Sequence, residues 1–129
     1  MNEDEIAAGL AETPGYRYAE VDGDQLYVAG QVPLDSSGTL TGADDAAVQA
    51  TVCLDNLRTL LSVHDFNVND VRRLVIYVVG EHQNLTDAWA AVTNWFPDEV
   101  PPATLLGVNL LGYVGQLVEV DATVVRRRA

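Results

Sequence analysis

The side chains that most often carry enzyme chemistry are few in this sequence and widely separated. One cysteine, Cys53, and two histidines, His64 and His82, occur among 129 residues. A zinc site needs several nitrogen or sulfur ligands that converge, and three such residues in separate segments do not predict one. The sequence also lacks a P-loop, a dinucleotide-binding glycine motif, a nucleophile elbow and an HExxH motif. We therefore expect no metal and no organic cofactor.

Carboxylates are the remaining candidates, and they include two on a strongly patterned segment. From residue 117 to 125, apolar residues alternate with Glu119, Asp121 and Thr123, which is typical of a strand with one buried face. Spacing alone favours a solvated strand face for Glu119 over a catalytic role. Cys53 lies among leucines that recur at helical spacing, so we interpret it as a core thiol rather than a nucleophile.

The charge balance excludes several classes of partner. Seven basic residues oppose nineteen acidic ones, giving a formal net charge of -12, and every basic residue is an arginine. Nucleic acids and anionic membranes bind basic faces, so neither is an expected partner. The N-terminal segment is acidic, unlike a signal peptide, and no apolar run approaches the roughly 20 residues that span a bilayer. We expect a cytoplasmic protein without an intrachain disulfide.

Apolar periodicity predicts alternating strands and helices. Residues 16–19 and 25–32 indicate a β-hairpin, because the Asp-Gly pair within residues 21–24 favours a tight turn. A helix of about five turns should begin near Thr41, Asp44 or Asp45 and end near His64, which could cap it. The later predicted elements are a strand at 71–79, a helix at 85–96 capped by Asn84 or Thr86, and strands at 104–111 and 117–125.

This order, β-β-α-β-α-β-β, predicts a two-layer α/β sandwich. One domain should span residues 12–126, with a flexible tail or short appended helix at 1–11 and a basic tail at 127–129. Two helices cannot cover all the apolar residues that the strands offer, among them Leu26, Val28 and Leu105 or Leu106. Since large exposed apolar faces usually mark association, we expect an oligomer.

Several segments carry a resemblance to a known family. They are YVAGQVPLDSSGTLTGADDAAVQA at residues 27–50, Asn56-Leu57, Phe96, PPAT at 101–104 and VEVDA at 118–122. Together they resemble the RidA/YjgF-type reactive-intermediate deaminase family, also labelled endoribonuclease L-PSP. The resemblance covers about residues 16–125, and GQVPLD at 30–35 is its most specific part.

The resemblance implies a chorismate-mutase-like fold and a homotrimer whose sheets face a common axis, with clefts where subunits meet. It also implies hydrolysis of enamines and imines to keto acids and ammonia, without a metal or organic cofactor. In the family motif P-A-R-S/T, the arginine clamps the substrate carboxylate. Ala103 occupies that position here, so loss of this charge-assisted contact predicts poor turnover of anionic substrates such as 2-iminobutanoate.

The other family positions are partly retained. The resemblance makes Glu119 the carboxylate that positions the attacking water, and it makes Tyr16, Gly30 and Thr104 substrate-binding residues. By spacing alone, Tyr16 would be an ordinary strand aromatic. Three further positions would line the pocket without the polarity found in many relatives, and these are Ala29, Trp89 and Ala103. Trp89 also lies on an apolar helical stripe, where core packing is the simpler interpretation.

Two functions from different classes remain open. The first is an enzyme that hydrolyses a neutral or cationic imine or enamine with Glu119 as the base. The second is a non-catalytic trimer that binds a small-molecule ligand or regulates a partner enzyme. A ribonuclease ranks third, because the chain is acidic and has no paired catalytic histidines.

Overall fold

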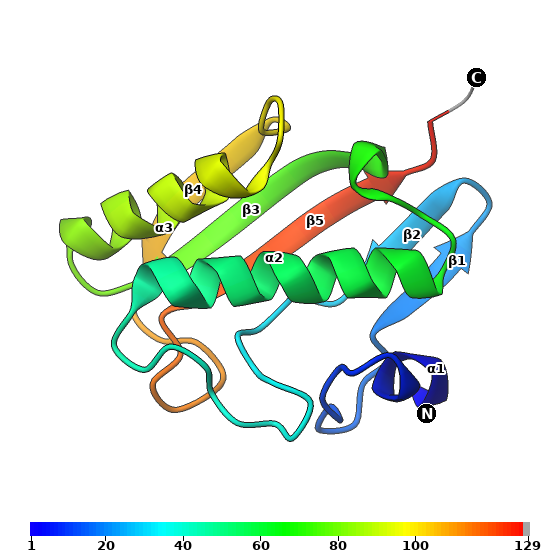
Figure 1. Cartoon of the computed structure of the whole chain (residues 1–129), viewed down its shortest axis with the longest axis horizontal. Helices are drawn as coiled ribbons and strands as arrows, with labels where there is room; N and C mark the ends of the chain where they lie inside the picture. The colour runs from blue at the N-terminus through cyan, green and yellow to red at the C-terminus, as the bar shows by residue number, and fades with distance from the viewer. Residues whose placement is uncertain (128–129) are drawn as a thin grey trace.

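The computed structural model describes residues 1–127, and it forms the expected two-layer α/β sandwich (Figure 1). Two residues of the predicted basic tail, Arg128 and Ala129, lie outside the described residues. The elements in chain order are α1 (Glu3–Ala7), β1 (Ala19–Asp22), β2 (Gln25–Val28), α2 (Ala46–Val63), the 3-10 helix η1 (Val68–Asp70), β3 (Val71–Val79), α3 (His82–Trp95), β4 (Ala103–Val108) and β5 (Val118–Val125).

One five-stranded sheet has the order β1-β2-β5-β3-β4. β3 pairs antiparallel with β5 and parallel with β4, and α3 is the crossover between the two parallel strands. Both α2 and α3 lie over one face of the sheet (Figure 1). We call the opposite side the open face. None of the helices in residues 1–127 is long and apolar enough to cross a membrane.

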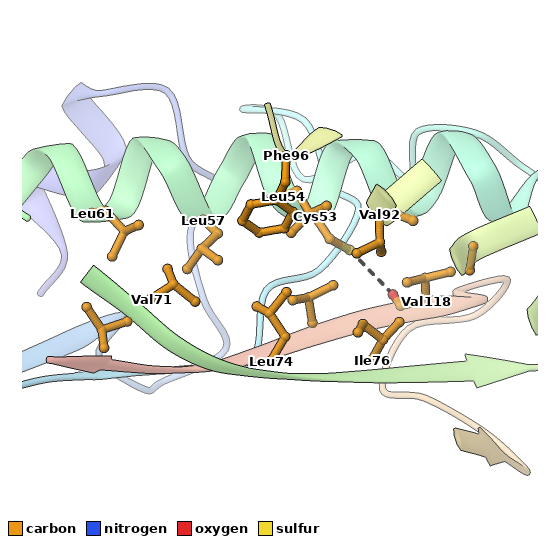
Figure 2. Close-up of a cluster of buried hydrophobic side chains, with 14 of the residues drawn as sticks. Cys53, Leu54, Leu57, Leu61, Val71, Leu74, Ile76, Val92, Phe96 and Val118 are labelled. Carbon is orange, nitrogen blue, oxygen red and sulfur yellow. Dashed lines mark hydrogen bonds between the residues drawn. The ribbon is translucent and has the colours of Figure 1, made fainter. Parts of the chain in front are cut away.

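The core lies between the helices and the sheet, as the periodicity of the sequence indicates (Figure 2). The leucine and alanine stripe of α2 is buried, and Asp45 caps the helix by accepting a hydrogen bond from the Val48 amide at 3.0 Å. Cys53 is 0% exposed, and its Sγ lies 3.6 Å from the Val118 carbonyl oxygen. Burial raises the pKa of this thiol well above its ordinary value. Cys53 is therefore a core residue, as predicted.

We expect Leu54→Ala to lower the free energy of unfolding by about 2–5 kcal/mol, because it removes buried methyl groups and leaves a cavity. Leu54 lies on the buried face of α2 and is 0% exposed. Leu110→Ala is the matched control, since Leu110 is 82% exposed and its truncation should change stability by less than about 0.5 kcal/mol. Urea unfolding measures both variants, and equal effects would contradict this description of the core.

Some predicted boundaries were wrong. The hairpin forms, but β1 runs over Ala19–Asp22, because the turn contains only Gly23 and Asp24 and Gly23 adopts a φ of +61°. α3 begins at His82, a turn earlier than predicted. Its N-cap residue, Glu81, makes no side-chain cap, and Asn84 instead donates from Nδ2 to the Val79 carbonyl at 2.9 Å. The predicted strand 104–111 ends at Val108.

The N-terminal segment contacts the domain through buried residues. It contains the short helix α1, the second of the two predicted alternatives. Glu5 is 6% exposed, and its Oε2 lies 2.6 Å from Nε2 of His64, the C-cap residue of α2. Leu10 and Ala11 are each 3% exposed. Apolar burial therefore begins before the predicted boundary at residue 12. The contact between Glu5 and His64 joins residues 59 positions apart, so no local sequence pattern predicts it.

Candidate functional site

Glu119 lies on the open face of the sheet. Its neighbours Val118 and Val120 are buried on the helix side, so the alternation of β5 directs Glu119 the other way. Tyr77 of β3 is its cross-strand partner. A shallow cavity of about 260 Å³ opens here, and its lining consists of Val28, Gly30, Tyr77, Leu111, Glu119 and Asp121. This cavity is the candidate site.

Gly30 makes room for the carboxylate of Glu119. A Cβ atom added at Gly30 would lie 2.3 Å from Oε2 of Glu119, closer than non-bonded atoms can approach. The backbone of Gln31, the next residue, pairs with Val120 through hydrogen bonds of 2.7 and 3.0 Å. This bridge holds Gly30 against β5, so the site requires the absence of a side chain at this position.

Gln116 donates a hydrogen bond to the carboxylate of Glu119, a contact that the sequence analysis did not predict. It is 3% exposed, and its Nε2 donates to Oε1 of Glu119 at 3.2 Å and to the Val118 carbonyl at 3.0 Å. Its own Oε1 accepts from the Tyr113 amide at 3.2 Å. A single glutamine in a loop carries no sequence signal, so only the loop conformation identifies Gln116 as a positioning residue.

The surroundings of Glu119 raise the pKa of its carboxyl group. Burial raises the pKa of Glu119 above its ordinary value of 4.5, the hydrogen bond from Gln116 lowers it in part, and the charge of Asp121 adds to the rise. A carboxylate whose pKa is shifted toward neutrality is suited to accept and return a proton. The cavity can therefore activate a water molecule.

Tyr16 lies near the same carboxylate. Burial and then the adjacent Tyr113 raise the pKa of Tyr16 to about 12, with a smaller contribution from the charge of Glu119. Its hydroxyl therefore remains a hydrogen-bond donor at neutral pH. The N-terminal segment positions this tyrosine, since Asn2 donates to the Tyr16 carbonyl at 2.9 Å and accepts from the Tyr18 amide at 2.9 Å. Thr13 also donates to the Tyr16 carbonyl.

The raised pKa of Glu119 predicts a pH-dependent stability. The unfolded chain ionises near the ordinary value of 4.5, below the folded pKa. As the pH rises through the interval between the two values, the wild type should therefore lose stability relative to Glu119→Gln. Below this interval the difference should be constant. Urea midpoints across a pH series test this, and a wild type that gains relative stability as the pH rises would contradict it.

The structure places Thr104 on the open face but two strands from β5. Thr104 is the partner of Val75 on β3, which in turn is the partner of Asp121 on β5. Its Oγ1 accepts a hydrogen bond of 2.8 Å from Nη2 of Arg73. Thr104 is therefore not a wall of the cavity in a single chain, and its substrate-binding role stays a prediction.

The three predicted apolar wall residues also lie outside the cavity of a single chain. Trp89 and Ala103 are partly buried and pack against the core cluster, on the helix side of the sheet. Ala29 precedes Gly30 and donates from its amide to the Tyr18 carbonyl at 2.8 Å. The geometry therefore brings Glu119 and Gly30 together in the cavity, with Tyr16 outside its lining but close enough to feel the charge of Glu119, and it leaves Ala29, Trp89 and Ala103 outside the lining.

Metal ligands do not converge in the described part of the chain. Among residues 1–127, no three histidine, cysteine, aspartate or glutamate side chains form a group that could hold a metal ion. His64 is engaged with Glu5, and Cys53 is buried in the core. The chemistry of the cavity is thus that of carboxylates, a phenol and an amide.

Known proteins share both the sequence pattern and the fold. The family described as Endoribonuclease L-PSP matches residues 8–126. A RutC family protein from Sulfurisphaera tokodaii is 27% identical over 97 residues, which cover 74% of this chain and 76% of the relative. A structure described as a candidate endoribonuclease from Thermotoga maritima has a TM-score of 0.83 at 22% identity, covering 94% of each chain.

Two Escherichia coli structures extend this comparison. The YjgF gene product has a TM-score of 0.80 at 22% identity, covering 91% of this chain and 92% of its own. TdcF with bound serine has a TM-score of 0.75 at 17% identity, covering 91% of this chain and 92% of its own. At these identities the similarity of the structures concerns the fold.

Proposed function

Because the chain belongs to the Endoribonuclease L-PSP family, that of the RidA and YjgF proteins, we propose that it hydrolyses a neutral or cationic imine or enamine. The observation that carries this proposal is the position of Glu119. Its carboxylate faces an open cavity, is held by Gln116 and has a pKa raised by burial. The TdcF structure with bound serine supports a small metabolite as the ligand of such a protein.

The proposed reaction needs only water. Glu119 removes a proton from a water molecule while the water oxygen forms a bond to the imine carbon, and the electron pair of the C=N bond moves to nitrogen. Glu119 returns this proton to nitrogen, to which the nearby Tyr16 hydroxyl can hydrogen-bond, and a carbinolamine forms. Nitrogen then takes up the proton of the new hydroxyl group, the C–N bond breaks, ammonia leaves and the carbonyl product forms. The atoms balance as imine plus water to carbonyl compound plus ammonia.

The charge of the cavity supports the proposed substrate class. Two carboxylates, Glu119 and Asp121, line it, and among residues 1–127 no arginine does. By the resemblance of residues 101–104 to the family motif, we infer that Ala103 replaces the arginine whose guanidinium pairs with a substrate carboxylate. An anionic substrate would meet two negative charges without a bidentate partner, whereas a protonated imine would be attracted.

We further propose that the cavity is completed in a homotrimer. Tyr27 of β2 is 54% exposed to solvent. Tyr77 and Leu111 line a cavity that is shallow in a single chain. Packing of open faces around a common axis would cover these side chains and could bring Thr104 of one subunit near Glu119 of another. Light scattering after gel filtration tests this, and the mass of a monomer would contradict it.

Two imines with the same side chain provide the discriminating test of function. An amine oxidase acting on 2-phenylethylamine generates a neutral or cationic imine, and an amino-acid oxidase acting on phenylalanine generates its anionic counterpart. Adding the protein should speed ammonia release from the first imine and have little effect on the second. Equal or greater acceleration with the anionic imine would overturn the proposed specificity.

A non-catalytic metabolite-binding trimer is the alternative, and the missing guanidinium at Ala103 favours it. In that case the protein would accelerate neither imine, while Glu119 would still contribute a hydrogen bond to a bound ligand. RNA cleavage is a weaker candidate despite the family description, since a net charge of -12 opposes binding of a polyanion.

A further inference from the structure

A second and larger cavity lies away from the open face. Its volume is about 890 Å³, and it is bounded by the C-terminal half of α2, the segment around η1 and the connection from α3 to β4. This connection lies at the end of the sheet where β3 begins and β5 ends (Figure 1). We call this cavity the arginine groove, because Arg58, Arg72 and Arg127 line it.

Two of these arginines are oriented by the backbone. Val71 pairs with Val124, so the ends of β3 and β5 lie side by side. Nε of Arg72 donates to the Val125 carbonyl at 3.2 Å, and Nε of Arg127 donates to the Asn69 carbonyl at 2.6 Å. Each bond uses the inner nitrogen of the guanidinium, and within residues 1–127 the terminal nitrogens of both side chains make no hydrogen bond.

Acidic residues lie close to these two guanidinium groups, although within residues 1–127 neither forms an ion pair: Asp70 accepts a hydrogen bond of 2.9 Å from the Arg127 amide, and Asp98 and Glu99 line the same groove. The chain holds nineteen acidic residues against seven basic ones, so an arginine with a purely structural role has many available partners. Arg17 and Arg58 do pair, with Glu20 and Asp55. In the described part of the chain, Arg72 and Arg127 form no ion pair with a carboxylate. The groove lining therefore carries a small excess of positive charge, with three arginines against the two carboxylates of Asp98 and Glu99, on an acidic molecule.

The opposite wall of the groove is aromatic and apolar. Trp95 and Phe96 pack edge to face with ring centroids 4.9 Å apart, and the guanidinium of Arg58 lies 5.0 Å from the Trp95 ring. Val100 adds apolar surface, whereas Phe66 is buried and the guanidinium of Arg126 lies 4.1 Å from its ring. Flat ligand groups bind well between aromatic rings and guanidinium planes. The groove therefore combines an anion-binding end with an apolar wall.

We propose that the arginine groove binds a small organic monocarboxylate that has a flat apolar body. Its carboxylate would accept hydrogen bonds from the terminal nitrogens of Arg72 and Arg127, and its ring would lie against Trp95. Asp98 and Glu99 also line the groove, and they disfavour ligands with several negative charges. This site is separate from the Glu119 cavity, so it does not depend on the proposed imine hydrolysis.

Phenylacetate is a suitable probe, with phenylacetamide as its uncharged counterpart. Calorimetry should show binding of phenylacetate, and the Trp95 indole N–H resonance should shift. We expect phenylacetamide to bind at least about tenfold more weakly, and Arg72→Gln and Arg127→Gln each to weaken phenylacetate binding by about tenfold or more. Arg73→Gln is the matched control, because Arg73 contacts Thr104 on the open face. Arg73→Gln and Glu119→Ala should leave this binding unchanged.

The proposal fails if phenylacetate does not bind at about 10 mM, where a millimolar site would be largely filled. It also fails if phenylacetamide binds equally well, or if Arg73→Gln weakens binding as much as Arg127→Gln does. Tighter binding of inorganic phosphate than of phenylacetate would show a simple anion site and would equally overturn the proposed ligand class. Arg127 is exposed, so its replacement should leave the fold intact, and thermal unfolding checks this for both variants.

Discussion

Glu119→Gln should lower kcat/KM for hydrolysis of the 2-phenylethylamine-derived imine by about 10²–10⁴-fold, the usual contribution of a positioned acid or base. The amide is close to the carboxylate in size and can retain contact with Gln116, but it cannot accept a proton from water. Ammonia release under conditions where the oxidase is not limiting measures the effect. The acid limb of the pH–rate profile, which should have a midpoint above 4.5, should disappear in this variant.

Asp121→Asn is the matched control for this substitution. Asp121 lies two residues along β5 and lines the same cavity, so its loss changes the local charge equally. It should change kcat/KM by much less than Glu119→Gln does, since its side chain is not the one held by Gln116 beside Gly30. Equal losses in the two variants would show that the cavity acts through its total charge, and Glu119 would then not be the base.

Gly30→Ala should reduce the same activity by about 10²-fold, the effect that a displacement of about 1 Å has on a reacting group. The new methyl group would lie 2.3 Å from Oε2 of Glu119, so the carboxylate or the Gly30 backbone must move. The bridge between Gln31 and Val120 resists movement of the backbone. Steady-state kinetics on the neutral imine measures the change.

Gly112→Ala separates this steric effect from a general effect of alanine. A Cβ at Gly112 would meet no atom within 4 Å, and the residue does not adopt a positive φ. Its replacement should leave both activity and stability close to those of the wild type. Overpacking at Gly30 should in addition lower the free energy of unfolding by about 1–3 kcal/mol. A Gly30→Ala protein with full activity would show that the carboxylate position is not important for the reaction.

The two cavities differ in charge although they belong to one small domain. The Glu119 cavity is lined by two carboxylates on the open face, while the arginine groove has three arginines and two carboxylates beside aromatic rings on the helix side. Two ligands of different charge could therefore bind at once without competing. Arg73→Gln and Asp121→Asn, each on the open face, should affect the groove little.

Much of the fold follows from local patterns in the sequence. The three- and four-residue spacing of the α2 leucines, the continuous β3 strand and the alternation of β5 each reflect the geometry of one element. The Asp-Gly turn predicted the hairpin for the same local reason. The matching segments indicated the family, and through it they singled out Glu119, Gly30 and Tyr16.

Tertiary structure alone decided how these residues meet. The pairing of Tyr77 with Glu119 and the contact of Glu5 with His64 join segments whose separation along the chain hides any shared pattern. The hydrogen bond from Gln116 to Glu119 is local in sequence, but it depends on the conformation of the loop before β5. Trp89 shows the converse, because the family resemblance assigned it to a pocket while in this fold it packs against the core cluster. Periodicity determines which face of an element is buried, but register and loop conformation determine which polar groups come within hydrogen-bond distance.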